Sequence, residues 1–177
     1  ATFIKNASQS GAKLILMDPY RSDLARHADY FLQFNSDTDV PMLNALMNTI
    51  ISEKLYDREF VEQRTEGFPA LRDCVAEYTP ERVAPICGIP AQTLREVARL
   101  YASSRGSMIF WGMGVSQHIH GTDNARCLIA LALLCGQIGR PGCGIHPLRG
   151  QNNVQGASDV GLIPMVYPDY QPVTDPE

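Results

Sequence analysis

The chain has 177 residues, which is enough to bury the core of one domain. Its hydrophobic share of 45% and charged share of 19% are typical of a globular protein and exclude a disordered chain. The formal net charge is -4 and the acidic residues are scattered, so nucleic acid and anionic membranes are not expected as main partners. The longest apolar run, 127–135, is too short for a membrane span, which needs about 20 residues.

The N-terminal part of the chain alternates helical and extended patterns. Residues 2–10 predict an amphipathic helix that ends before Gly11, and the apolar run 13–17 predicts a buried parallel strand. A polar helical turn over 21–28 leads to a second predicted strand at 30–34. Acidic residues follow each strand, at the edge where ligands bind in parallel sheets.

The middle of the chain is predicted to be helical. Apolar residues recur at helical spacing over 43–50, after Thr38 or Asp39 as the N-cap. Asp57 and Thr79 are expected to cap two shorter helices that follow.

The last predicted elements return to the strand and helix alternation. A helix over 94–101 is expected to stop at Gly106, before a strand at 108–111. A nearly all-apolar helix over 122–135 follows and is closed by Gly136, after which the composition predicts loops. Strands that alternate with helices indicate an α/β fold with a mainly parallel sheet.

Five cysteines occur without a CxxC pair or a close pairing with histidine. Zinc sites and iron–sulfur clusters need such spacings, so no metal ligand set is expected in this chain. The pattern favours small buried thiols in a reducing compartment, and hence a cytoplasmic location. The chain starts without Met on residues typical of a helix, so we expect it to be part of a longer protein.

Acidic residues follow the first two predicted strands. Asp18 can accept hydrogen bonds from ribose hydroxyls, although a turn started with Pro19 is the simpler interpretation. Asp37, Thr38 and Asp39 stand at a helix start, where capping is again the simpler interpretation. A carboxylate in this position is also an acceptor for both the N1–H and N2–H groups of guanine.

The segment WGMGVSQ, residues 111–117, directly follows a predicted strand. Its two glycines allow the backbone to approach a phosphate or a flat cofactor closely, and a helix follows. Gln117 stands where a complete GxGxxG fingerprint has glycine, so the segment is not a dinucleotide motif. A plain turn after the strand explains the segment equally well.

The segment RGQNNVQG, residues 149–156, is rich in amide side chains and poor in core-forming residues. A buried loop of this composition must satisfy its amides, so it predicts the wall of a polar site. His118 and His120 lie on a predicted loop and indicate no specific role.

Two stretches of the chain resemble the catalytic subunits of formate dehydrogenases. They are residues 112–161, from GMGVSQ to RGQNNVQGASDVG, and residues 18–57, from DPY through NSDTDV to LYD. RGQNNVQGASD is specific within the wider molybdopterin oxidoreductase family. The resemblance implies a Rossmann-like three-layer domain of a larger multidomain subunit. Its parent would bind two molybdopterin guanine dinucleotides around Mo or W and oxidise formate to CO2.

The resemblance also implies roles for single residues. Asp18 and the turn of Asp37, Thr38 and Asp39 match positions that hold a guanosine end of the cofactor. The usual arginine of the DPR-like turn is replaced here by Tyr20, with an arginine next to it.

Further matches concern the pterin and the substrate. Met113 and Gln117 match residues that line the pterin, with Gly114 between them. Arg149 matches the arginine that holds the substrate beside the metal, and Gln151 is expected to face the same centre.

Two parts of the family's site have no counterpart in this sequence: the Cys-His or selenocysteine-His metal ligand and the cysteine cluster of an Fe4S4 centre. We expect residues 1–156 to form an α/β molybdopterin-guanine-dinucleotide-binding domain, incomplete at its N-terminal edge. Residues 157–177 are expected to be an extended Pro-rich tail that packs on the rest of the parent subunit. The isolated chain should hold no metal and be inactive. The expected partners are formate, the rest of the catalytic subunit and iron–sulfur or diaphorase-type electron-transfer subunits.

Three other interpretations stay open. The chain could serve as a guanine-nucleotide-binding module without redox chemistry. It could belong to another molybdopterin oxidoreductase, such as a nitrate reductase-like enzyme. Its polar loop could also do no more than dock a partner subunit.

Overall fold

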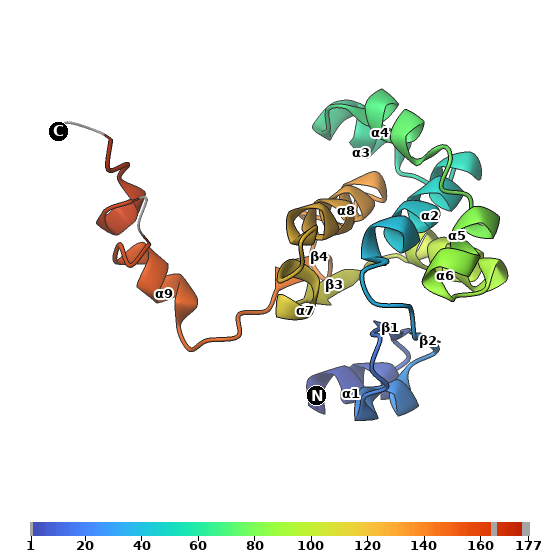
Figure 1. Ribbon diagram of the computed structural model, residues 1–177, viewed down its shortest axis with the longest axis horizontal. Coiled ribbons are helices and arrows are strands. Elements are labelled where there is room, and N and C mark those ends of the chain that lie inside the picture. The colour runs from blue at the N-terminus through green and yellow to red at the C-terminus, as the bar shows by residue number, and fades with distance from the viewer. Residues whose placement is uncertain (1, 164–165, 175–177) are drawn as a thin grey trace.

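The computed structural model describes residues 2–163 and 166–174. In chain order, the elements are α1 (Thr2–Gln9), β1 (Ile15–Met17), η1 (Asp23–His27), β2 (Tyr30–Leu32), α2 (Asp39–Ser52), α3 (Arg58–Arg64), α4 (Phe68–Val75), α5 (Pro80–Cys87), α6 (Ala91–Ser103), β3 (Met108–Trp111), α7 (Met113–Ser116), α8 (Gly121–Leu134), β4 (Gly144–Pro147), α9 (Val154–Asp159) and η2 (Pro168–Tyr170). Figure 1 shows a helical body, with α1, β1 and β2 at one side and α9 at the far end of an extended loop.

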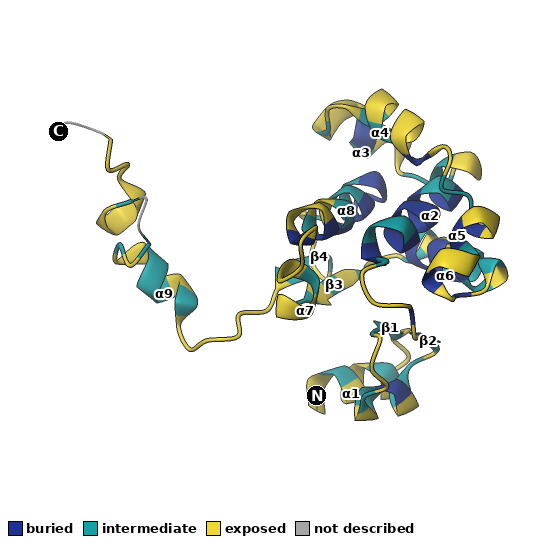
Figure 2. Cartoon of the chain, in the orientation of Figure 1, coloured by how far each residue is buried: buried dark blue, intermediate teal, exposed yellow. Residues whose placement is uncertain are grey.

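Helix α2 is the centre of the core because almost all of its faces are apolar. Its buried apolar residues are Met42, Leu43, Ala45, Leu46, Met47 and Ile50. A helix that is apolar all round must be enclosed, and α2 packs against α4, α5, α6 and α8. Burying each large side chain contributes about 1.5–3 kcal/mol, so this helix is a main source of stability. Figure 2 shows the buried residues gathered on α2 and on the faces turned toward it.

The predicted helix caps have different outcomes. The Asp57 carboxylate accepts a hydrogen bond from the Phe60 N–H at 3.0 Å and caps α3, as predicted. Thr79 caps α5 in the same way, with Pro80 in the first turn. Thr38 occupies the N-cap position of α2, but its hydroxyl donates to a carbonyl outside the helix and makes no cap bond. The prediction of side-chain capping is therefore wrong at α2.

The strands pair in parallel, which confirms the predicted α/β class. In the described ranges they form two separate two-stranded sheets, β1 with β2 and β3 with β4. Strand β4 falls in a region predicted to be loop, because a glycine at its start and Pro147 at its end are untypical of a strand. Pro147 takes the last position of the strand, where a missing N–H is tolerated.

Gln137, which is 1% exposed, joins the end of α8 to the start of β3. Its Oε1 accepts from the Ser107 N–H at 3.0 Å and from Arg140 Nη2 at 3.2 Å. Its Nε2 donates to the Ser104 carbonyl at 2.9 Å, and the Cys143 thiol donates to Oε1 at 3.2 Å. One buried amide therefore satisfies backbone groups on both sides of the turn into β3.

Replacing Gln137 with leucine should lower the free energy of unfolding by about 2–4 kcal/mol. The change keeps the side-chain volume but leaves the Ser107 N–H and the Ser104 carbonyl without partners, each at about 1–3 kcal/mol. Urea unfolding followed by circular dichroism measures the loss. Gln92 on α6 bonds only to Glu96 on the surface, so Gln92→Leu is the control and should change stability by less than about 0.5 kcal/mol. Equal losses in the two variants would contradict the role of Gln137.

The C-terminal part of the chain forms a small unit of its own. The Tyr170 hydroxyl donates to Asp159 Oδ1 at 2.9 Å and accepts from Gln155 Nε2 at 3.0 Å, which ties η2 to α9. Figure 1 shows this unit away from the helical body. Helix α9 crosses the predicted boundary between residues 156 and 157. Residues 164 and 176, two of the prolines of the predicted tail, lie outside the described residues.

The cysteines are unpaired thiols of differing exposure. Burial raises the pKa of Cys135 to about 12 and that of Cys127 to about 11, so both are protonated at neutral pH. Cys74 is exposed, contrary to the prediction of buried thiols. Residues 2–163 and 166–174 contain no cluster of three or more histidine, cysteine or acidic side chains that could hold a metal ion. No helix in these ranges has the length and apolarity needed to cross a membrane.

Candidate functional site

Four of the residues predicted from the sequence to form the site line one pocket. Met113 begins α7 and Gln117 directly follows it, while Arg149 and Gln151 come from the loop after β4. The carboxyl ends of parallel strands share an edge, so the segments that leave β3 and β4 meet there. The pocket has a volume of about 200 Å³ and opens to solvent. Residues 112–114 are called the glycine segment below, and residues 148–153 the arginine loop.

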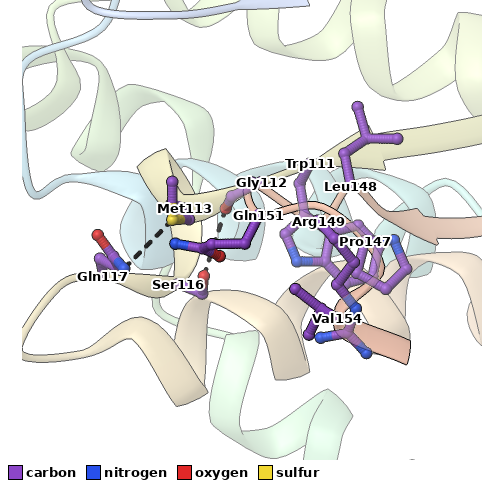
Figure 3. A pocket seen from close by; sticks show the side chains of 11 residues that line it. Trp111, Gly112, Met113, Ser116, Gln117, Pro147, Leu148, Arg149, Gln151 and Val154 are labelled. Carbon is purple, nitrogen blue, oxygen red and sulfur yellow. Dashed lines mark hydrogen bonds between the residues drawn. The ribbon is translucent and has the colours of Figure 1, made fainter. Parts of the chain in front are cut away.

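The pocket has apolar walls and a polar side. Trp111, Pro147 and Leu148 supply apolar surface, and Gln151 supplies an amide. Figure 3 shows Gln151 directed toward α7, whereas Arg149 extends toward α9. Within the described ranges no group accepts a hydrogen bond from the Arg149 guanidinium, so all five of its N–H donors face solvent or a ligand.

The arginine loop packs directly on the glycine segment. A Cβ atom at Gly150 would lie 2.6 Å from Met113 Cε, so a larger residue would require the end of the Met113 side chain to move. Met113 Sδ in turn accepts a hydrogen bond from Gln117 Nε2 at 3.3 Å. Gly150 therefore lets the backbone of the arginine loop contact the Met113 side chain.

The turn of Asp37, Thr38 and Asp39, called the 37–39 turn, is tied to the glycine segment by a histidine. His118 Nδ1 lies 2.6 Å from Asp37 Oδ1, and His118 Nε2 lies 2.6 Å from the Gly114 carbonyl oxygen. The Gly114 carbonyl, and then the Asp37 carboxylate, raise the pKa of His118. The sequence reasoning gave His118 no role, because a histidine on a loop shows its partners only in three dimensions.

Asp39, the first residue of α2, is 7% exposed. Burial raises the pKa of its carboxyl group, although the neighbouring His118 acts in the opposite direction. In the part of the chain that the structure describes, no side chain donates a hydrogen bond to this carboxylate. The Thr38 hydroxyl beside it donates instead to the Asn35 carbonyl at 2.6 Å. Asp39 is thus a buried acceptor with unused capacity.

Asp18 lies apart from this pocket, at the end of β1. Its Oδ1 accepts a hydrogen bond from the Tyr20 N–H at 2.8 Å, the contact expected of a turn. The Arg21 guanidinium lies 5.1 Å from the centre of the Phe31 ring. The carboxylate of Asp18 keeps further acceptor capacity, so the turn contact does not exclude a ligand.

The arginine loop differs from prediction in its exposure. Residues 149–153 are exposed, whereas their amide-rich composition predicted a buried loop. Their amides can be hydrated, because no described segment covers them. Trp111 and Leu148 also line the pocket but were not named as site residues, although Trp111 belongs to the segment 111–117 that the sequence singled out. Leu148 directly follows β4, a strand that the sequence did not predict.

Comparison with known proteins places this geometry in a family. The profile of the molybdopterin oxidoreductase family matches residues 1–173. Formate dehydrogenase H of Escherichia coli is 46% identical over 176 residues, 99% of this chain and 25% of that protein. The alpha subunit of the F420-dependent formate dehydrogenase of Methanocaldococcus jannaschii is 45% identical over 172 residues, 97% of this chain and 26% of that protein.

A solved structure shows the same fold. Acetylene hydratase from Pelobacter acetylenicus superimposes with a TM-score of 0.77 at 32% identity, over 80% of this chain and 19% of that one. The chain spans about a quarter of the length of the two formate dehydrogenases, 25% and 26%. From the match over residues 1–173, the chain belongs to the molybdopterin oxidoreductase family.

Proposed function

We propose that this chain is a segment of the catalytic subunit of a formate dehydrogenase. The segment would bind a molybdopterin guanine dinucleotide and present Arg149 to formate. The main observation in support is the pocket that gathers Met113, Gln117, Arg149 and Gln151 from two segments of the chain. The family implies a molybdopterin cofactor with Mo or W. Two relatives that align over nearly all of this chain are named formate dehydrogenases.

The residues around the pocket fit one part of such a cofactor. A pterin is flat and carries amide-like edges, which suits apolar walls beside the amides of Gln117 and Gln151. A Cβ atom at Gly114 would meet nothing within 4 Å, so the glycine segment leaves room for a close neighbour. The pocket volume of about 200 Å³ is below the common range of about 300–1,000 Å³. The remaining walls would come from other parts of the parent subunit.

The guanosine end would be held by the 37–39 turn, with Asp18, which directly follows β1, as a further acceptor. A buried carboxylate can accept from both guanine N1–H and N2–H, and Asp39 has that capacity free. We rank Asp39 before Asp37, whose carboxylate is already bonded to His118. Thr38 would then contribute its backbone rather than its hydroxyl.

Arg149 would hold formate by its carboxylate. Its planar guanidinium donates two parallel hydrogen bonds and stays charged at any working pH, so it both binds and orients the substrate. The C–H bond of formate then points away from the guanidinium. When bound, the metal–pterin group supplies the two-electron oxidation of formate to CO2. Gly150 allows the backbone of the arginine loop to contact the Met113 side chain, since a Cβ atom at this position would lie 2.6 Å from Met113 Cε.

The rest of the site would lie elsewhere in the parent. We place the metal ligand, the Fe4S4 cluster and the second dinucleotide site outside this chain, with iron–sulfur or diaphorase-type subunits as electron acceptors. One relative is named an alpha subunit, which supports an enzyme of several subunits. Residues 1–156 would form the cofactor-binding domain and residues 157–177 would pack on the parent. A cytoplasmic location stays a prediction.

The test is a comparison of the isolated chain with the full-length enzyme, both purified without oxygen. The full-length enzyme should contain Mo or W and reduce a viologen dye with formate. The isolated chain should contain neither metal and show no turnover. Nitrate is the second substrate to assay: nitrate reduction without formate oxidation would overturn the proposed function. Turnover by the isolated chain would contradict the placement of the metal ligand outside it.

A further inference from the structure

His118, in the turn between α7 and α8, joins two segments that are far apart in the sequence. Its partner Asp37 is 81 residues away, and its other partner, Gly114, belongs to the glycine segment. Each ring nitrogen lies 2.6 Å from an oxygen atom. The carbonyl oxygen of Gly114 can only accept a hydrogen bond, and so can the Asp37 carboxylate when it is ionised. A neutral imidazole has one donor and one acceptor nitrogen, so it can satisfy only one of these oxygens. With Asp37 ionised, both contacts are hydrogen bonds only in the imidazolium form.

The backbone on the Asp37 side is built to hold this contact. Asp37 has a φ of 63°, in the left-handed region that aspartate and asparagine tolerate better than most residues. The hydroxyl of Thr38, the residue after Asp37, donates a hydrogen bond to the Asn35 carbonyl, and this bond holds the turn on both sides of Asp37. On the other side, Gly114 directly follows Met113, which lines the pocket.

We propose that His118 is a proton-dependent latch: the imidazolium form ties the 37–39 turn to the glycine segment, and deprotonation releases one of the two bonds. His118 is thus a positioning residue that holds two parts of the cofactor cradle in register. The consequence for cofactor binding rests on the proposed function, whereas the contact of His118 and its dependence on pH do not.

The charges around His118 favour the latched form. Asp37 and Asp39 face it from the start of α2, and both raise its pKa together with the Gly114 carbonyl. At the start of α8, Asp123 is shared between His120 at 4.0 Å and Arg126 at 3.3 Å. Because the folded-state pKa is raised, the latch is fully present below the ordinary histidine value of 6.5. It is lost as the pH rises through the higher folded-state pKa.

Nuclear magnetic resonance of the imidazole nitrogens in the full 177-residue chain tests the latch directly. Both nitrogens of His118 should be protonated at pH 6.5, with a titration midpoint above that value. Asp37→Asn keeps a residue that tolerates the left-handed backbone but removes the charge, and should lower the midpoint. The matched control is His120→Gln in the same turn, which should leave the His118 midpoint unchanged. A wild-type midpoint at or below 6.5, or one that Asp37→Asn does not move, would overturn the proposal.

Amide hydrogen exchange gives a second readout that needs no assignment of the imidazole. The exchange rates are first corrected for the intrinsic effect of pH. The protection factors of the backbone amides in residues 36–39 and 113–117 should then fall together, roughly two- to fivefold, as His118 deprotonates. His118→Phe keeps a ring and removes both donors, so its protection should be low and independent of pH. Protection in this variant equal to that of the latched wild type would refute the latch. Both experiments use the cofactor-free chain, so their outcome is independent of the formate assay.

Discussion

Replacing Arg149 with lysine in the full-length enzyme is expected to lower kcat/KM for formate roughly ten- to a hundredfold. Lysine keeps the charge but loses the planar pair of donors, so formate would bind without a defined orientation. Steady-state dye reduction over a range of formate concentrations measures the loss. The Mo or W content should stay the same, because the apolar walls and the amides of the pocket are unchanged.

A matched control separates the site from the general effect of the substitution. Arg126 on α8 is an exposed arginine that pairs with Asp123 at 3.3 Å, so Arg126→Lys should leave kcat/KM within about twofold. If Arg149→Lys instead loses the cofactor, the arginine binds a cofactor phosphate or another domain. Wild-type kcat/KM in a fully loaded Arg149→Lys enzyme would remove its substrate role altogether.

Replacing Asp39 with asparagine should reduce the affinity of the full-length apoenzyme for its cofactor roughly ten- to a hundredfold. The carboxylate offers acceptors to two guanine donors, whereas an amide offers only one oxygen. Cofactor content per folded protein, measured after limited supply of the cofactor, reports the change. Asp37→Asn should have the smaller effect, because Asp37 is exposed and bonded to His118. Normal loading in both variants would refute the guanine assignment.

Asp39→Asn should weaken cofactor binding but raise the free energy of unfolding of the isolated chain. Burial raises the pKa of Asp39, so ionisation of this group destabilises the fold. The loss develops as the pH rises from the ordinary value of 3.8 to the raised pKa and is complete above it. Asparagine does not titrate, and at neutral pH it should stabilise the chain by about 0.5–2 kcal/mol. Asp73→Asn, at an exposed position on α4, is the control and should change little. A carboxylate that lowers stability but improves loading is what a functional group in a buried position should show.

Long helices with a strong apolar pattern could be predicted from the sequence, and short elements could not. Helices α2, α6 and α8 each fall within a few residues of their predicted ranges, because burial and local pattern agree there. Helix α4 and strand β4 were not predicted. Both are short, and β4 contains the residues that usually break a strand, so only its pairing with β3 decides its conformation.

Some features of the candidate site could likewise be predicted from the sequence, and others could not. Residues that follow strand ends could be predicted, because parallel strands bring their carboxyl ends to one edge. That rule singled out the segment that contains Met113 and Gln117. Arg149 and Gln151 were predicted instead from the amide-rich composition of their loop and from the family resemblance, and the structure brings all four residues to one pocket. The contact of His118 with Asp37 spans 81 residues and leaves no local pattern. The exposure of residues 149–153 could not be predicted either, because it depends on which segments fold over the loop and not on its composition.

The most direct measurement is a high-resolution structure of the loaded full-length enzyme with formate bound. The account predicts that the two Arg149 nitrogens lie within hydrogen-bond distance, about 2.7–2.9 Å, of the two formate oxygens. The pterin should lie against Met113 and Gln117, with guanine bonded to Asp39. A structure in which formate binds away from Arg149, while its guanidinium contacts a cofactor phosphate or an interdomain carboxylate, would contradict the account.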